Sequence, residues 1–315
     1  MTIGIHGSQA RLYINDLDMS LYVEQVDQEI TRATAEHTPL AAQTTNRAVG
    51  VNSVTLNLTG SAYVADSNAA HHWEQAQASD NALYAFVPGG DVVGRVVYCA
   101  HSMQGDMSIT APSSDIVRIP FGHLGTGQLD RARILRAMAV GGTSPGVHVD
   151  GTALSSGGGA AYVFCSDMTG TDPTLTVTIQ HSADEATWVP LAGMETLLAP
   201  GALKLQIHPT GALPIVGADT VADEIDVAGD WSRAFIPGVC FEIVGSTGNN
   251  GIYTTGASIY DALTNETTIA VAENIADGTA DGTAEIGDVR QYVRVSWTLT
   301  GTSPTARWFA AFARH

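Results

Sequence analysis

Alternating apolar and polar residues mark two long strands near the start of the chain. Residues 54–58 alternate valine and leucine with threonine and asparagine, and residues 26–31 alternate in the same way. A period of two places successive side chains on opposite faces of a strand. We therefore expect a paired unit in residues 12–63 with one packed face and one wet face. The wet face carries either Asp27 and Glu29 or their opposite neighbours, because the alternation alone does not fix the register.

The two strands are separated by a polar stretch, residues 33–52. It is longer than the usual connection between strands and has few apolar side chains to bury by itself. We expect it to be an extended loop.

The rest of the first half reads as one short helix and several strands. Residues 66–78 predict a helix, and two strands at 83–87 and 92–100 are joined by a Pro-Gly-Gly-Asp turn. Residues 116–121 predict a closing strand. Residues 129–136 fit either a final strand or a linker.

Glycine-rich residues 140–159 break the periodicity and predict a domain boundary. Beyond it, residues 174–180 and 292–299 alternate cleanly, and the stretch between them contains four or more short strands with Gly and Asn turns. We interpret this as a small acidic β-domain inserted into a hairpin of a second sandwich. The expected all-β domains are residues 1–140, residues 141–212 with 289–315, and the insert at residues 213–288.

Composition supports an all-β protein. The chain has 33 glycines, only 15% charged residues and one lysine, Lys204, which is poor stock for helices. A hydrophobic fraction of 44% and a mean hydropathy of +0.08 predict a folded, water-soluble protein. We expect neither a secretion signal nor a membrane span, because no charged-then-apolar leader and no run of about 18 apolar residues occurs. The three separated cysteines, Cys99, Cys165 and Cys240, predict buried free thiols.

Charge is unevenly placed. The net charge is −18, and residues 213–288 hold 13 acidic side chains against one arginine. A negative chain without a basic stripe repels nucleic acid and does not bind it specifically.

Candidate chemistry is sparse. His71 and Glu74 face one another on the expected helix, but His72 points away and no second cluster completes a metal site. The carboxylates of residues 277–285 recur every four residues and miss the calcium-loop signature, so a solvated turn followed by an edge strand is expected. The sequence contains no Gly-x-Ser-x-Gly elbow, and the glycines of residues 122–127 miss phosphate-loop spacing. We expect no catalytic, metal or cofactor site.

Four tryptophans lie in or beside strands of the distal half, and we expect them to pack in the core or at hinges, although exposed tryptophans on a sandwich could stack on sugars. They are Trp188, Trp231, Trp297 and Trp308.

The first 140 residues resemble the major tail tube protein of long-tailed, siphovirus-like bacteriophages. The resemblance rests on the turn at residues 18–22, the strand, long loop and strand that end at Val54–Gly60, the expected helix, and the closing strands to about residue 134. Residues 174–188 and 292–304 resemble a β-sandwich module common in phage tail proteins. The motif at residues 245–254 is similar to small phage β-modules, although the sandwich usually lacks so large an insert.

The resemblance implies a structural virion protein of the tail, made in the host cytoplasm, and not an enzyme. Subunits would form rings, by default hexameric and alternatively trimeric, that stack into a tube for DNA ejection. Partners would be the tape measure, tail terminator and distal tail proteins, with DNA passing without specific binding. The lumen would be lined by the wet face, with Asp27 and Glu29 as candidates. Residues of the 33–52 loop would reach a neighbouring subunit or ring, namely Thr38, Pro39, Leu40, Gln43, Asn46 and Arg47.

Two alternatives stay open. The first is a distal-tail or baseplate ring protein that adapts the tube to fibres. The second, from a different class, is a carbohydrate-binding module that uses the distal tryptophans.

Overall fold

The fold is all-β, as the alternation predicts. The structure is a computed structural model that describes residues 9–36, 47–61, 81–107, 118–126, 129–141, 144–152, 155, 158–207, 212–232, 234–286 and 288–315. Within these ranges the regular elements are strands, apart from one 3-10 turn, η2 (Met19–Leu21). The chain divides into two compact units, residues 1–91 with 96–131 and residues 92–95 with 132–315, which are described separately.

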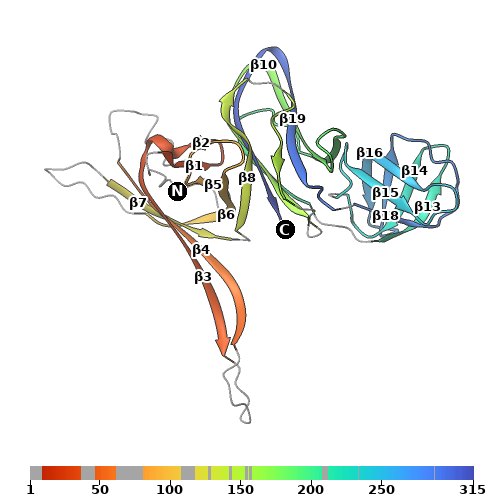
Figure 1. Cartoon of the computed structure of the whole chain (residues 1–315), viewed down its shortest axis with the longest axis horizontal. Coiled ribbons are helices and arrows are strands. Elements are labelled where there is room, and N and C mark those ends of the chain that lie inside the picture. Colours follow the sequence, from red (N-terminus) through yellow and green to blue (C-terminus); the bar gives the residue numbers. More distant parts are fainter. Residues whose placement is uncertain are drawn as a thin grey trace, which may run out of the picture. The chain divides into compact units, whose positions relative to one another are not determined.

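The first unit is a single antiparallel sheet in the order β2-β1-β5-β6-β7-β4-β3 (Figure 1). Strand β6 pairs with β5 through residues 98–102 and with β7 through residues 102–107. The sheet therefore folds back on itself along β6. The strands are β1 (Arg11–Ile14), β2 (Leu17–Asp18), β3 (Val23–Glu36), β4 (Arg47–Ser61), β5 (Ala82–Val87), β6 (Val96–Met107) and β7 (Arg118–Gly125).

The folded-over sheet buries one core. Leu12 and Ile14 of β1, Tyr84 of β5, and Leu56 and Leu58 of β4 are each 1% exposed or less and belong to one cluster. Leu56 and Leu58 are apolar positions of the period-two pattern, so their burial fixes the register of the β3–β4 pairing.

Two expectations for this region need correction, and one open alternative is decided. The loop expected at residues 33–52 is shorter, because β3 continues to Glu36 and β4 begins at Arg47, with Thr34 opposite Val49. The strand expected at 92–100 begins at Val96, because residues 92–95 form a turn closed by the bond from the Arg95 amide to the Val92 carbonyl, 3.1 Å. The undecided residues 129–136 lie in a strand, β8 (Asp130–Val140). The helix expected at residues 66–78 lies outside the described residues.

The second unit contains a β-sandwich built around two very long strands, β10 (Gly159–Ser182) and β19 (Tyr292–Arg314). They are paired antiparallel from end to end, and each contributes one half to each layer. One layer is β12-β10-β19-β8 and the other is β11-β10-β19-β9. The short strands are β9 (Val149–Asp150), β11 (Val189–Gly193) and β12 (Gly201–Ile207).

A repeated motif folds both long strands at the same level. Residues 170–174 read Gly-Thr-Asp-Pro-Thr and residues 301–305 read Gly-Thr-Ser-Pro-Thr. Gly170 and Gly301 have φ values of 117° and 124°, which strongly favour glycine, and a Cβ on either would lie within 2.9 Å of a backbone oxygen of the opposite motif. Each motif thus bends its strand out of one layer and into the other, around a shared core that contains Val163, Val177 and Trp308.

Between β12 and β19 the chain forms a closed six-stranded barrel in the order β13-β14-β17-β16-β15-β18 (Figure 1). It has its own core, with Phe235, Phe241 and Ile269 each 2% exposed or less. The prediction of an edge strand after residues 277–282 is wrong. Strand β18 lies between β13 and β15, and the closed barrel has no edge there. The domain limits expected from the sequence stay a prediction. The strands are β13 (Leu213–Asp219), β14 (Glu224–Ala228), β15 (Cys240–Val244), β16 (Gly251–Asp261), β17 (Glu266–Val271) and β18 (Thr283–Glu285).

Arg314 and His315 bind the backbone near residues 289–291, where the chain returns from the barrel, and near Gly158. The Arg314 guanidinium donates to the backbone carbonyls of Val289, Arg290 and Gln291, at 3.2, 2.6 and 2.6 Å. The His315 amide donates to the Gly158 carbonyl at 3.2 Å. The end of β19 is therefore tied to its own beginning.

Candidate functional site

The β3–β4 hairpin has one packed and one exposed face. Val54, Leu56 and Leu58 of β4 are 2% exposed or less. On the opposite face Glu29 pairs with Thr55 and Asp27 pairs with Asn57, and both acidic residues are exposed. The wet face of this hairpin is therefore the one that carries Asp27 and Glu29.

The outer edge of β3 has no strand partner among the described residues. Among the described strands, β3 pairs with β4 alone, along nearly its whole length. Backbone amides and carbonyls on the outer edge of a strand can pair with a strand from another chain.

A cavity of about 460 Å³ lies beside the first residues of this edge. Its lining includes the apolar side chains of Leu12, Val26 and Phe86, with Arg11 and Glu24 as charged members. The edge is thus accompanied by a space that could accept side chains of an added strand.

The wet face continues from β4 onto β7 and β6. Thr55 pairs with Leu124, which pairs with Met103. Leu124 and Met103 are 46% and 42% exposed. This face is acidic along β3, neutral along β4 and partly apolar at its far side.

Most of the residues expected to contact a neighbour lie outside the described residues. Of the six, only Arg47 is among the described residues, where its backbone opens β4 opposite Glu36 and is not part of a loop. The others lie outside the described ranges and stay predictions: Thr38, Pro39, Leu40, Gln43 and Asn46.

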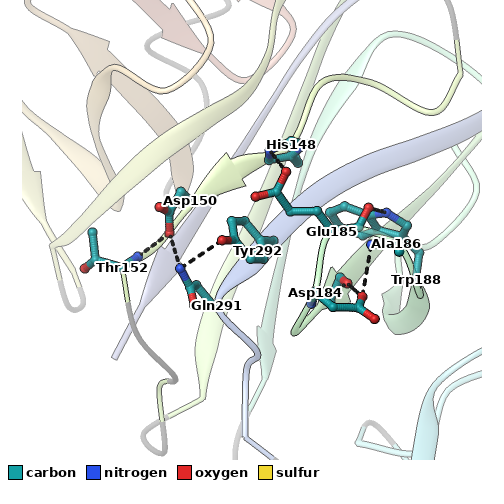
Figure 2. Close-up of polar contacts among 10 residues, drawn as sticks. His148, Asp150, Thr152, Asp184, Glu185, Ala186, Trp188, Gln291 and Tyr292 are labelled. Carbon is teal, nitrogen blue, oxygen red and sulfur yellow. Dashed lines mark hydrogen bonds and ion pairs between the residues drawn. The ribbon is translucent and has the colours of Figure 1, made fainter.

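A second polar cluster lies at one end of the sandwich, shown in Figure 2. The His148 imidazole Nε2 lies 3.2 Å from a Glu185 carboxylate oxygen, and the His148 ring stands 6.0 Å from Trp188 and 5.6 Å from Tyr292 between centroids. Gln291 donates to the Tyr292 hydroxyl at 3.1 Å. No local sequence motif indicates this cluster, because its members come from three distant segments.

The turn that carries Glu185 is held by its neighbour. Asp184 Oδ1 accepts hydrogen bonds from the Ala186 and Thr187 amides, at 3.0 and 2.8 Å, and from the Ser182 hydroxyl at 2.9 Å. The Thr187 and Ala186 amides, then the Ser182 hydroxyl, lower the pKa of Asp184 to about 2. Glu185 has a φ of 62°, a strained conformation that this turn maintains. The cluster ties the 148–150 segment to the turn and to β19.

The distal tryptophans mostly pack against other side chains of the second unit. Trp308 is 1% exposed, and Trp297 packs edge-on against it at 5.2 Å. The Arg136 guanidinium lies 4.1 Å from the Trp308 ring centroid and the Arg294 guanidinium lies 4.1 Å from that of Trp188. Trp231 donates its indole N–H to the Ala228 carbonyl at 2.8 Å.

Two buried histidines lack the surroundings of catalytic groups. The Ser102 hydroxyl and His123 Nδ1 are 3.2 Å apart, but both residues are at most 1% exposed and out of reach of substrate. Burial lowers the pKa of His123 to about 4. Burial, followed by the charges of Arg290 and Arg314, lowers the pKa of His181 to about 3. Both rings are therefore neutral at pH 7.

The acidic loop before β18 binds its own barrel. Asp281 accepts from the Ser246 hydroxyl at 2.7 Å and from the Thr247 amide, and the Asn249 side chain accepts from the Asp277 amide at 3.0 Å. Among the described residues no group of three or more His, Cys, Asp or Glu is arranged to hold a metal ion. His71, His72 and Glu74 fall outside those residues. Over the same part of the chain, no helix has the length and apolarity to cross a membrane.

Comparisons with known proteins give weak likenesses. No protein-family model matches the chain, and no curated protein matches it. Similar solved structures include the tail of an empty gene transfer agent particle with C6 symmetry, at 13% identity over 41% of this chain and 98% of that chain, TM-score 0.33. The SPP1 Dit protein covers 96% of this chain and 98% of its own at 7% identity, TM-score 0.31. A chain of the activated phage p2 baseplate covers 97% and 98% at 7% identity, TM-score 0.30. Scores this low establish neither family nor function.

Proposed function

We propose that this protein is a structural subunit of a bacteriophage tail that assembles with itself into stacked rings. The observation that carries the proposal is the β3–β4 hairpin, whose outer strand has no strand partner among the described residues beyond β4. A long edge of this kind is a hazard in a monomer and is satisfied when copies close into a ring. The sequence resemblance to tail tube proteins supports the same role.

In this proposal the hairpins of neighbouring copies join edge to edge into a continuous inner barrel. The face that carries Asp27, Glu29 and Asn57 lines the lumen. Carboxylates repel the phosphate backbone, so DNA passes without being held. Function consists of assembly and not of catalysis.

The ring is hexameric by default, with a trimer as the alternative, and the protein resides in the virion tail. Its further partners are the tape measure, tail terminator and distal tail proteins. A distal-tail ring that adapts the tube to fibres uses the same edge but does not stack into long tubes.

The test is negative-stain electron microscopy of the purified chain at high concentration, with mass photometry alongside. Stacked rings or hollow tubes are the expected result and also give the symmetry. Discrete single rings would favour the distal adaptor, and a persistent monomer of 32.9 kDa would contradict self-assembly.

A deletion separates assembly from folding. Removing residues 39–46 and closing the hairpin with a two-residue Asn-Gly turn should abolish tubes while the subunit stays folded by circular dichroism, because the β3–β4 core lies elsewhere. Normal tubes from this variant would contradict the role of Pro39 to Asn46 as the contact between subunits or rings.

A further inference from the structure

The outward face of four barrel strands carries an apolar and acidic surface that the barrel itself does not use. It is formed by β13, β18, β15 and β16, and we name it the barrel face. Its members are Val216, Val244, Ile252, Glu242 and Glu285. The three apolar side chains are 43%, 43% and 55% exposed.

The strand registers place four of these residues near one another, and Val216 lies two residues beyond Pro214 on β13, where the register with β14 shifts. Glu242 of β15 pairs with Ile252 on one side and with Glu285 on the other. Val244 lies two residues along the same strand, opposite Thr283, which pairs with Pro214. Neighbouring strands lie about 4.8 Å apart, so these positions form a continuous surface and not scattered single residues.

Glu242 and Glu285 lie directly opposite each other on adjacent strands, and Glu285 accepts a hydrogen bond from the Thr283 hydroxyl at 3.1 Å. Like charges directly opposite on adjacent strands repel. The described part of the insert, residues 212–232 and 234–286, contains no lysine or arginine to offset them. A basic partner side chain placed between the two carboxylates would relieve the repulsion.

The second unit offers a surface of complementary character elsewhere. In the 92–95 turn Val92 is 50% exposed, and Arg95 is exposed beside it. The exposed Arg133 of β8 donates to the Gly94 carbonyl of this turn at 2.9 Å. We name Val92, Arg95 and Arg133 the basic turn.

From this complementarity we infer that the barrel face of one copy docks on the basic turn of a second copy. The guanidinium groups of Arg95 and Arg133 would meet Glu242 and Glu285, while Val92 packs among the exposed apolar side chains. The inference rests on the proposed self-assembly and assigns a role to the acidic insert, which would connect copies. Two different surfaces are used, so the contact is heterologous and can propagate along an assembly.

The test is charge reversal measured by mass photometry across a concentration series. E242R/E285R alone and R95E/R133E alone should each raise the concentration needed for assembly about tenfold or more, because like charges then face each other. The chain that carries all four substitutions should assemble near the wild-type concentration. The matched control is D261R/E266R, which makes the same charge change elsewhere on the barrel and should leave assembly near wild type.

The outcomes separate the two proposals. If wild type assembles and E242R/E285R assembles equally well, the docking inference is overturned while the proposed function stands. Failure of the four-substitution chain to recover, or equal loss in the D261R/E266R control, would also overturn the docking inference. A wild-type chain that stays monomeric at all concentrations overturns both.

Discussion

At the scale of single residues, buried ionisable side chains make stability depend on pH. His123 and His181 are 1% and 7% exposed, and their rings are neutral in the folded chain because burial disfavours the charged form. The unfolded chain takes up protons on both as the pH falls below the ordinary histidine pKa of about 6.5. Their contribution is therefore fully present above that pH and is lost progressively as the pH falls towards 4 and 3.

This predicts a fall in the free energy of unfolding between pH 7 and pH 5. Each histidine contributes a slope of up to about 1.4 kcal/mol per pH unit below 6.5. Urea unfolding at the two pH values measures it. A folded His123→Gln variant should show a flatter dependence than wild type, and a substitution of the half-buried His148 to Gln serves as control. An unchanged slope in His123→Gln would contradict the assignment.

At the scale of elements, the bend shared by β10 and β19 defines the sandwich. Threonine pairs flank it on both sides, with 2.6 Å between the hydroxyls of Thr169 and Thr305 and the same between Thr174 and Thr300. The two glycines allow the strands to change layers where the register shifts, and regular pairing resumes on both sides of the bend. Two strands can thus supply the centre of both sheets.

A side chain at the bend should destabilise the sandwich. In Gly301→Ala the new Cβ would lie 2.8 Å from the carbonyl oxygens of Thr171 and Asp172, at a φ of 124°. The expected loss is about 1–3 kcal/mol in the free energy of unfolding, measured by chemical denaturation. Gly201→Ala is the control, since its Cβ would make ordinary contacts no closer than 3.6 Å. Equal stability of the two variants would contradict a special role for the bend.

The sequence predicts the elements better than their extents or partners. Alternation locates β4, because it buries Val54, Leu56 and Leu58 against a core, whereas β5 buries four successive residues from Ala82 to Ala85 and is located by the turn that follows it. The alternation predicts that the first long strand ends at residue 32, because the residues beyond have no apolar repeat. In the structure β3 nevertheless continues to Glu36, paired through its backbone with β4. The Gly-Thr-x-Pro-Thr repeat is a sequence signal of the paired bend. Hydrophobic periodicity does not reveal this signal. Contacts such as His148 with Glu185 had no local signal, as they depend on tertiary register.

At the scale of the whole molecule, the barrel is an insertion that closes on itself. Its first and last strands are adjacent, with Leu213 opposite Ala284, and its core is distinct from that of the sandwich. Closure removes strand edges, so the barrel can be added to the chain without opening the sandwich.

Excising the barrel should therefore leave the sandwich folded. Replacing residues 212–287 with a short Gly-Ser linker keeps β12, β19 and the Arg314 contacts at the return point. Tryptophan fluorescence should retain the buried signal of Trp308, and unfolding should remain cooperative. Loss of cooperative unfolding in this variant, with wild type as reference, would show that the barrel is required for folding.

The sandwich also gathers both connections of the barrel at one place. Ile207, the last residue of β12, and Arg314 both pair with Gly159, where the chain enters β10. The Arg314 guanidinium in turn holds the carbonyls just before Tyr292, where the chain returns from the barrel. Tension applied between Gly159 and the barrel therefore acts on this junction and does not pull along the length of the β10–β19 pair.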